Sequence, residues 1–134
     1  MSEPLWAAFM PWPPSNNHYY TVVRGRKILS SEGRRYGESA AFATAGRNRP
    51  VQPLSGRLRV EVLASPPDRR RRDLDNLLKP VLDALTRGQV IGDDSQIDDL
   101  RICRRAVLSG GKLAVTIWQD EPDFSDEAEA VEGM

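Results

Sequence analysis

A run of four arginines leads directly into two aspartates near the middle of the chain, in the segment RRRRDLDNLLK (residues 69–79). Asp73 and Asp75 are separated by one residue, and Lys79 follows four residues after the second aspartate. In extended chain, residues two apart project to the same side, so we expect the two carboxylates to point together. Carboxylate oxygens are preferred ligands of Mg²⁺ and Mn²⁺, which also keep positions open for water and phosphate. The spacing therefore indicates a site for a hard divalent metal ion.

Positive charge on both sides of the aspartates matches a phosphate-containing substrate. The four arginines are expected to hold a polyanionic backbone close to the acids, which would otherwise repel it. Lys79 is placed to stabilise negative charge that develops on a phosphate during hydrolysis. Carboxylates for the ion and cations for the phosphate are what metal-assisted attack of water on a phosphodiester needs.

The same residues also permit a purely structural interpretation. The arginines can neutralise the aspartates in a surface charge network, with Asp75 or Asn76 capping the helix that follows. Lys79 can form an i,i+4 ion pair with Asp83, an interaction worth only about 0.2–0.5 kcal/mol. A second acidic segment, GDDSQIDD (residues 92–99), adds a further candidate ligand from a separate turn.

Length and composition limit the class of protein. A chain of 134 residues, 40% apolar and 28% charged, is expected to form one globular domain. No apolar run approaches the roughly 18 residues of a membrane span, and no basic leader with a long apolar stretch indicates a signal peptide. Cys103 is the only cysteine, which excludes an internal disulfide and fits a reducing compartment. We therefore expect a cytoplasmic protein.

The net charge of zero conceals a strong asymmetry along the chain. Residues 1–119 contain 19 bases and 12 acids, a balance of +7, whereas residues 120–134 contain seven acids and no base. This pattern predicts a polyanion-binding domain over residues 1–119 and an acidic, disordered tail over residues 120–134. A role of the tail in solubility alone explains its composition equally well.

The first half of the chain predicts a hairpin, a helix and a strand. Residues 19–23 and 26–29 have the composition of two strands around the turn Arg24-Gly25. A helix is expected after the Ser30-Ser31 pair, which can cap it. Residues 57–64 alternate between apolar and charged side chains, as a half-buried strand does.

The second half predicts another helix and two more strands. The helix covers most of residues 77–86, because Pro80 is tolerated only in its first turn, and this leaves residues 73–75 extended. Residues 97–107 and 112–119 are expected to pair as a hairpin through the glycines at 110 and 111. The predicted fold class is α+β: a single small domain with a mixed sheet of about four to five strands packed against two helices.

The motifs taken together resemble the RusA family of phage and prophage Holliday-junction resolvases, the crossover junction endodeoxyribonucleases. The resemblance rests on RRRRDLDNLLKPVLDALT followed by VIGDDSQIDDLRI, and on PWPPSNNHYY, RGR, SEG and SGGKLAVTI elsewhere. It covers roughly residues 9–118. It implies a homodimeric, Mg²⁺-dependent endonuclease, with Mn²⁺ able to substitute. Such an enzyme binds four-way DNA junctions and nicks two strands symmetrically during recombination and repair.

The resemblance also implies which residues form the site. The catalytic and metal-binding acids are Asp73, Asp75 and Asp94, with Asp94 a better match than Asp93, and the essential lysine is Lys79. The expected DNA contacts are Arg69, Arg70, Arg71, Arg72, Asn16 and Asn17, although asparagines after Pro-Pro are also good turn residues.

Two other functions remain compatible with the sequence. The first is an Mg²⁺-dependent nuclease with the same core that acts on other branched or flap DNA. The second is a non-catalytic junction-binding protein in which the acids only order the arginine segment.

Overall fold

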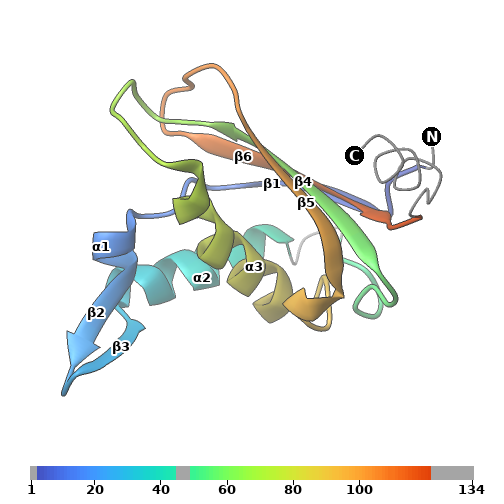
Figure 1. The fold of residues 1–134 in the computed structure, drawn as a ribbon, viewed down its shortest axis with the longest axis horizontal. Helices are drawn as coiled ribbons and strands as arrows, with labels where there is room; N and C mark the ends of the chain where they lie inside the picture. The colour runs from blue at the N-terminus through green and yellow to red at the C-terminus, as the bar shows by residue number, and fades with distance from the viewer. Residues whose placement is uncertain (1–2, 45–48, 122–134) are drawn as a thin grey trace, which may run out of the picture.

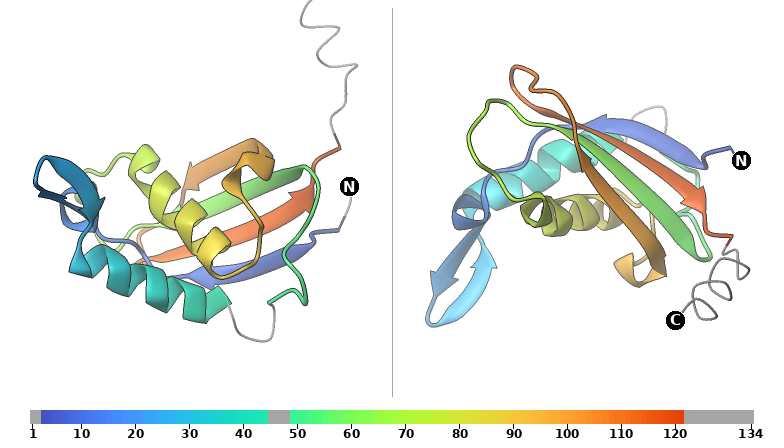
Figure 2. Two further views of the ribbon diagram at one scale, coloured as in Figure 1. Left: turned by 90° about the horizontal axis from the view of Figure 1, so that it is seen from below. Right: turned by 45° about the horizontal axis from the view of Figure 1, so that its top comes forward.

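The computed structural model describes residues 3–44 and 49–121, and its centre is a four-stranded mixed sheet (Figure 1). In sheet order the strands are β1 (Trp6–Met10), β6 (Lys112–Gln119), β4 (Leu58–Ser65) and β5 (Ile97–Arg104). β4 and β5 pair in parallel, while β1 and β4 both run antiparallel to β6. Two helices, α2 (Ser31–Thr44) and α3 (Leu78–Arg87), cover one face of this sheet (Figure 2).

The core lies between the sheet and the two helices. The alternating residues of β4 predicted to face inward are all fully buried: Leu58, Val60, Val62 and Ala64. α3 contributes Val81, Ala84 and Leu85 from one face, as the 3.6-residue periodicity predicts. The predicted α+β class and the mixed sheet on two helices are therefore confirmed. Within residues 3–44 and 49–121, no helix has the length and apolarity needed to cross a membrane.

The predicted hairpin between the last two strands is wrong. β4 lies between β5 and β6, so β5 is an edge strand that pairs in parallel with β4. Residues 105–111 instead follow the end of β4, where Arg105 N donates to Ala64 O at 2.8 Å and Leu108 N donates to Pro66 O at 2.9 Å. The glycines at 110 and 111 belong to the connection that crosses over β4 from β5 to β6. The turn residues alone do not distinguish such a crossover from a hairpin.

The chain just before α3 is not extended, as the sequence suggested, but forms a short 3₁₀-helix, η1 (Leu74–Leu77). Asp73 precedes it with extended dihedral angles (φ −90°, ψ 136°), whereas Asp75 lies inside its first turn. The prediction that the two carboxylates project to the same side of an extended strand is therefore wrong. Pro80 does lie in the first turn of α3, where a missing N–H leaves no hydrogen bond unmade.

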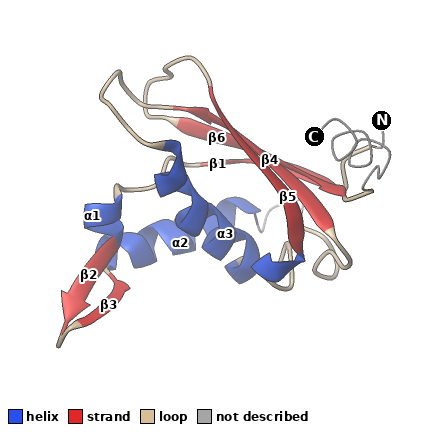
Figure 3. Ribbon diagram, in the orientation of Figure 1, coloured by secondary structure: helices blue, strands red, loops and turns tan. Residues whose placement is uncertain are grey.

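A second, two-stranded sheet is formed by β2 (Tyr20–Val23) and β3 (Arg26–Leu29), as predicted (Figure 3). Arg24 and Gly25 connect the strands with positive φ values of 53° and 76°, the signature of a tight hairpin turn. A one-turn helix, α1 (Asn16–Tyr19), precedes β2 and buries Tyr19 in the core.

Two glycines in α2 have different structural roles, and this gives a stability prediction. A Cβ atom at Gly33 would lie 2.3 Å from the backbone oxygen of Tyr19, whereas one at Gly37 would meet only the flexible end of Arg87. We expect Gly33→Ala to lower the free energy of unfolding by about 1–3 kcal/mol, because it forces the backbones apart. Gly37→Ala should leave it unchanged or raise it by up to about 1 kcal/mol through helix propensity. Urea denaturation of both variants checks the prediction, and equal effects would contradict it.

Candidate active site

Two clefts flank the start of α3 and divide the predicted site residues between them. One cleft, of about 310 Å³, is lined by Asp73 together with residues of the arginine segment and of the segment 12–18. The other, of about 410 Å³, is lined by Lys79 and Asp94. Asp75 is exposed on η1 and lines neither cleft. The structure therefore places Asp73, Asp75 and Lys79 at the start of α3, and Asp94 on a cleft that runs along α3. The four predicted catalytic residues do not share one cavity.

The carboxylates of Asp73 and Asp75 are not neutralised by the neighbouring arginines. In the described part of the chain, neither carboxylate takes part in a hydrogen bond or an ion pair, and both residues are exposed. Neither Asp75 nor Asn76 caps α3, because its N-cap residue is Leu77. The structural alternative offered by the sequence, a capped helix with arginine-paired acids, is therefore not what the fold contains.

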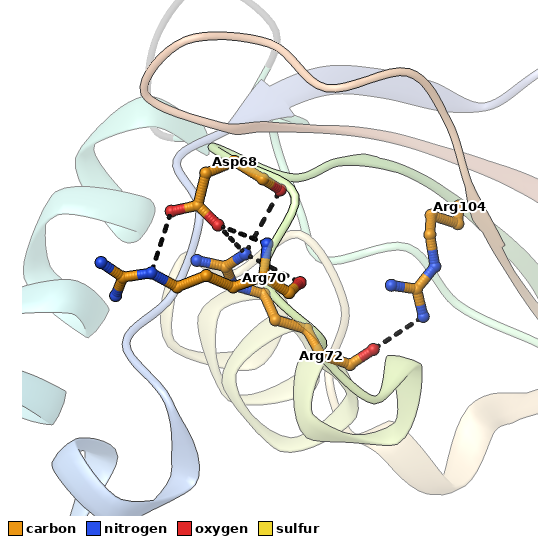
Figure 4. A network of polar contacts seen from close by, with 4 residues as sticks. All are labelled: Asp68, Arg70, Arg72 and Arg104. Atoms are coloured by element: carbon orange, nitrogen blue, oxygen red, sulfur yellow. Dashed lines mark hydrogen bonds and ion pairs between the residues drawn. The ribbon is translucent and has the colours of Figure 1, made fainter.

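The arginine segment is instead held by Asp68, a residue that sequence reasoning missed (Figure 4). Asp68 Oδ1 accepts hydrogen bonds from Arg72 Nη1 at 2.5 Å and from the backbone N of Arg70 at 2.9 Å. Arg104 donates to the backbone oxygen of Arg72 at 2.7 Å and ties the segment to β5. The hydrogen bond from Arg72 lowers the pKa of Asp68 to about 2. The only sequence signal was an acid four residues before Arg72.

The four arginines consequently divide into two kinds. Arg70 and Arg72 contact Asp68, and the Arg72 guanidinium also lies 5.9 Å from the ring centre of Trp12. Arg69 and Arg71 are exposed, and neither has a hydrogen-bond or ion-pair partner among the described residues. Alternate arginines are therefore the ones free to contact a ligand.

Lys79 forms the i,i+4 ion pair that its spacing predicts. Its Nζ lies 2.8 Å from Asp83 Oδ1, and Asp83 Oδ2 accepts a 2.9 Å hydrogen bond from the buried Tyr19 hydroxyl. Asp83 raises the pKa of Lys79, and the charge of Asp94 adds to this effect. The lysine side chain is 58% exposed and lines the cleft. The Tyr19–Asp83 contact orients Lys79 and had no signal in the sequence, because it joins residues 64 positions apart.

The turn that carries Asp93 and Asp94 gives the two aspartates different environments. It is a short 3₁₀-helix, η2 (Asp94–Gln96), and Gln96 Oε1 accepts hydrogen bonds from the backbone N–H groups of Gly92 and Asp93, both at 2.9 Å. Asp93 also accepts a hydrogen bond from Ser95 Oγ, which lowers the pKa of Asp93. Asp93 thus shapes the turn. Both aspartates line the cleft that contains Lys79, and the charge of Asp94 acts on Lys79.

Asn16 is connected directly to the acidic motif. Its Nδ2 donates to Asn76 Oδ1 at 2.7 Å, which joins α1 to η1. Asn17 is exposed beside it in the same one-turn helix. The structure therefore brings Asn16 to the predicted site, although by way of Asn76.

The donor set fits a hard divalent cation in chemistry but is not a closed cage. Asp73, Asp75 and Asp94 offer exposed carboxylate oxygens, the ligand type that Mg²⁺ prefers. Among residues 3–44 and 49–121, no group of three or more His, Cys, Asp or Glu side chains is close enough to hold one ion. Mg²⁺ is commonly bound by one or two carboxylates with water and substrate phosphates, so an open arrangement is compatible with it.

The fold and the site define a small α+β domain with exposed acids and an ion-paired lysine beside a basic loop. Residues 11–118 match the family described as endodeoxyribonuclease RusA. The chain is 43% identical over 110 residues to the crossover junction endodeoxyribonuclease of Enterobacteria phage 82, and 42% identical over the same length to that of Escherichia coli (strain K12). In both cases the match covers 82% of this chain and 91% of the relative. The chain therefore belongs to the RusA family of endodeoxyribonucleases.

Proposed function

We propose that this protein is an Mg²⁺-dependent endonuclease that resolves four-way Holliday junctions in the cytoplasm of a bacterium. The names of the relatives, crossover junction endodeoxyribonuclease, support the substrate. The observation that carries the proposal is that the carboxylates of Asp73 and Asp75 are exposed and have no partner among the described residues, while the nearby Arg72 and Lys79 have other acidic partners. Carboxylates left unpaired next to so much positive charge suit a metal-binding role better than a structural one.

Each acidic and basic group has a distinct role in this proposal. Asp73, Asp75 and Asp94 are the candidate ligands. One or two of them would hold the ion together with water and a substrate phosphate, and the bound ion would activate water and neutralise phosphate charge. Lys79, kept protonated and oriented by Asp83, would stabilise the charge that develops on the scissile phosphate. Mn²⁺ is expected to replace Mg²⁺, because it accepts the same oxygen ligands.

The basic segment and α1 would hold the DNA backbone. Arg69 and Arg71 have no partner within the described part of the chain and would contact phosphates, and Arg70 and Arg72 add positive potential while they maintain the conformation of the segment. Asn16 and Asn17 lie next to the acidic motif and would contact the strand that enters the cleft.

A homodimer is proposed as the active form. A four-way junction has near two-fold symmetry, and a C2 dimer presents two equivalent sites to it. Two nicks at symmetric positions then follow from one binding event. Sedimentation of the protein with and without junction DNA tests this part of the proposal.

A panel of substrates separates the proposal from its rivals. Wild-type protein with Mg²⁺ should cleave an immobile four-way junction at least about tenfold faster than a three-way, a flapped or a linear DNA of the same sequence. Equal or faster cleavage of a flap would indicate a different branched-DNA nuclease. Junction binding without cleavage under Mg²⁺ or Mn²⁺ would indicate a binding protein. A library of core sequences prevents a narrow sequence preference from being mistaken for inactivity.

The Asp83–Lys79 pair gives a prediction about pH dependence. Asp83 raises the pKa of Lys79, so the protonated lysine persists until the pH rises through that raised value. Asp83→Asn removes the carboxylate, so the alkaline limb of the cleavage rate should move to lower pH. Asp98→Asn, which breaks the exposed pair with Arg57, is the matched control and should leave the limb in place. An unmoved limb in Asp83→Asn would show that Lys79 does not act as the protonated group.

A further inference from the structure

The β2–β3 hairpin stands apart from the body of the protein. Among the described residues, its strands pair only with each other, and the hairpin projects from the rest of the fold (Figures 1 and 2). Every residue from 21 to 28 is exposed. Val22, Val23 and Ile28 are 69%, 49% and 42% exposed. A two-stranded hairpin is marginally stable alone, and β-branched side chains left in water at a projecting element indicate a surface that a partner covers.

The charge of the hairpin indicates the chemistry of that partner. Arg24, Arg26 and Lys27 lie at and next to the turn, and residues 20–29 contain no acid. A projecting element that combines several cations with uncovered apolar side chains is complementary to nucleic acid, where phosphates lie beside sugars and bases.

The base of the hairpin is part of the Lys79 cleft. Leu29 lines this cleft with Lys79 and Asp94, and the charge of Lys79 acts on the Tyr20 hydroxyl. Ser30 fixes the base, because its N and Oγ both donate to Tyr19 O, at 3.0 and 3.1 Å. The hairpin is thus anchored at the site.

One face of the hairpin includes Leu29 and therefore begins at the wall of the cleft. The cross-strand pairs Tyr20–Leu29 and Val22–Lys27 place these four side chains on the same face. The ammonium of Lys27 lies 4.2 Å from the ring centre of Tyr20. A strand lying in the cleft would therefore pass directly along this face.

We propose that the β2–β3 hairpin is a second DNA-binding element, which grips the backbone beside the scissile phosphate and guides the strand toward Lys79 and Asp94. The inference rests on the proposed function and specifies how the same site holds its substrate. The arginine segment and the hairpin then contact the DNA from the two sides of the α3 N-terminus.

The test removes charge from the hairpin while preserving its turn. Arg24 has a φ of 53°, and asparagine before glycine is the preferred pair for such a turn, so Arg24→Asn with Arg26→Gln keeps the hairpin folded. The matched control is Arg59→Gln with Arg101→Gln, which removes two charges from the sheet cleft at Trp118. Fluorescence anisotropy with a labelled four-way junction in EDTA measures binding over a series of salt concentrations, without cleavage.

The hairpin variant should bind the junction about tenfold more weakly at moderate salt, and the slope of log K against log salt should fall by about 2. The control should change the slope by less than about 0.5. Equal losses in both variants, or none in the hairpin variant, would overturn the inference. The inference would also be overturned if the hairpin variant no longer forms a dimer in sedimentation but each protomer binds the junction with unchanged affinity. The hairpin would then contact a second copy of the chain rather than DNA. Weaker binding in the hairpin variant alone supports the inference even if the wild-type protein cleaves no DNA. The binding assay therefore tests the role of the hairpin separately from the proposed nuclease function.

Discussion

Asp75→Asn should lower the rate of junction cleavage by at least about 10³-fold and leave junction binding intact or tighter. Asparagine keeps the size of the side chain and loses the charge that a divalent cation needs. The Asp75 carboxylate is exposed and unpaired within the described residues, so its replacement removes no contact on which the fold depends. Removing a negative charge beside the phosphate backbone also reduces repulsion, which favours binding.

Asp99→Asn is the control for this prediction, since it removes one exposed acid from the edge strand β5. It should cleave at the wild-type rate. Single-turnover cleavage of a labelled junction and anisotropy in EDTA measure the two properties separately. The proposed metal site is contradicted if Asp75→Asn still cleaves the junction and neither Asp73→Asn nor Asp94→Asn abolishes cleavage. The three acids would then have no metal-binding role.

Lys79→Met should reduce cleavage by about 10²–10³-fold, the typical effect of removing one group that stabilises transition-state charge. The methionine preserves the aliphatic part of the side chain and deletes the ammonium that lies 2.8 Å from Asp83. The expected loss is in the cleavage step rather than in junction affinity, because one exposed phosphate contact contributes little to binding by comparison.

Lys112→Met provides the comparison for Lys79→Met, because Lys112 is an exposed lysine that lies over Phe9 at the other side of the sheet. It should have no effect on the cleavage step. Lys79→Arg should recover part of the lost activity if charge alone matters. A Lys79→Met protein that cleaves normally but binds weakly would assign the lysine to DNA binding only.

The sequence predicted most elements of the fold because their signals are local. The alternation in β4, the turn at Arg24-Gly25 and the proline in the first turn of α3 are each set by residues close in the chain. The pairing of β4 with β5 was missed because parallel strands join residues far apart, and no local turn specifies them.

The candidate site shows the same division between local and distant signals. The acidic motif and the Lys79–Asp83 pair follow from short spacings. Two contacts join residues far apart in the sequence: the hydrogen bond from Tyr19 to Asp83 and the one from Asn16 to Asn76. Only the fold reveals them. Asp73 is extended as predicted, but the conformation of Leu74 and Asp75 was mispredicted because a 3₁₀ turn before a helix has no strong sequence signature.

The predicted tail over residues 120–134 lies, from residue 122 onward, outside the described residues. Its seven acids still balance the +7 charge of the rest of the chain.

The most direct measurement uses an immobile four-way junction with each strand labelled in turn, incubated with wild-type protein in Mg²⁺ or in EDTA. We predict nicks at symmetric positions in one pair of opposing strands, in Mg²⁺ only, and none in a linear duplex of the same sequence. Tight binding with no nick in any strand, or equal nicking of the linear duplex, would contradict a junction-resolving enzyme built around Asp73, Asp75, Asp94 and Lys79.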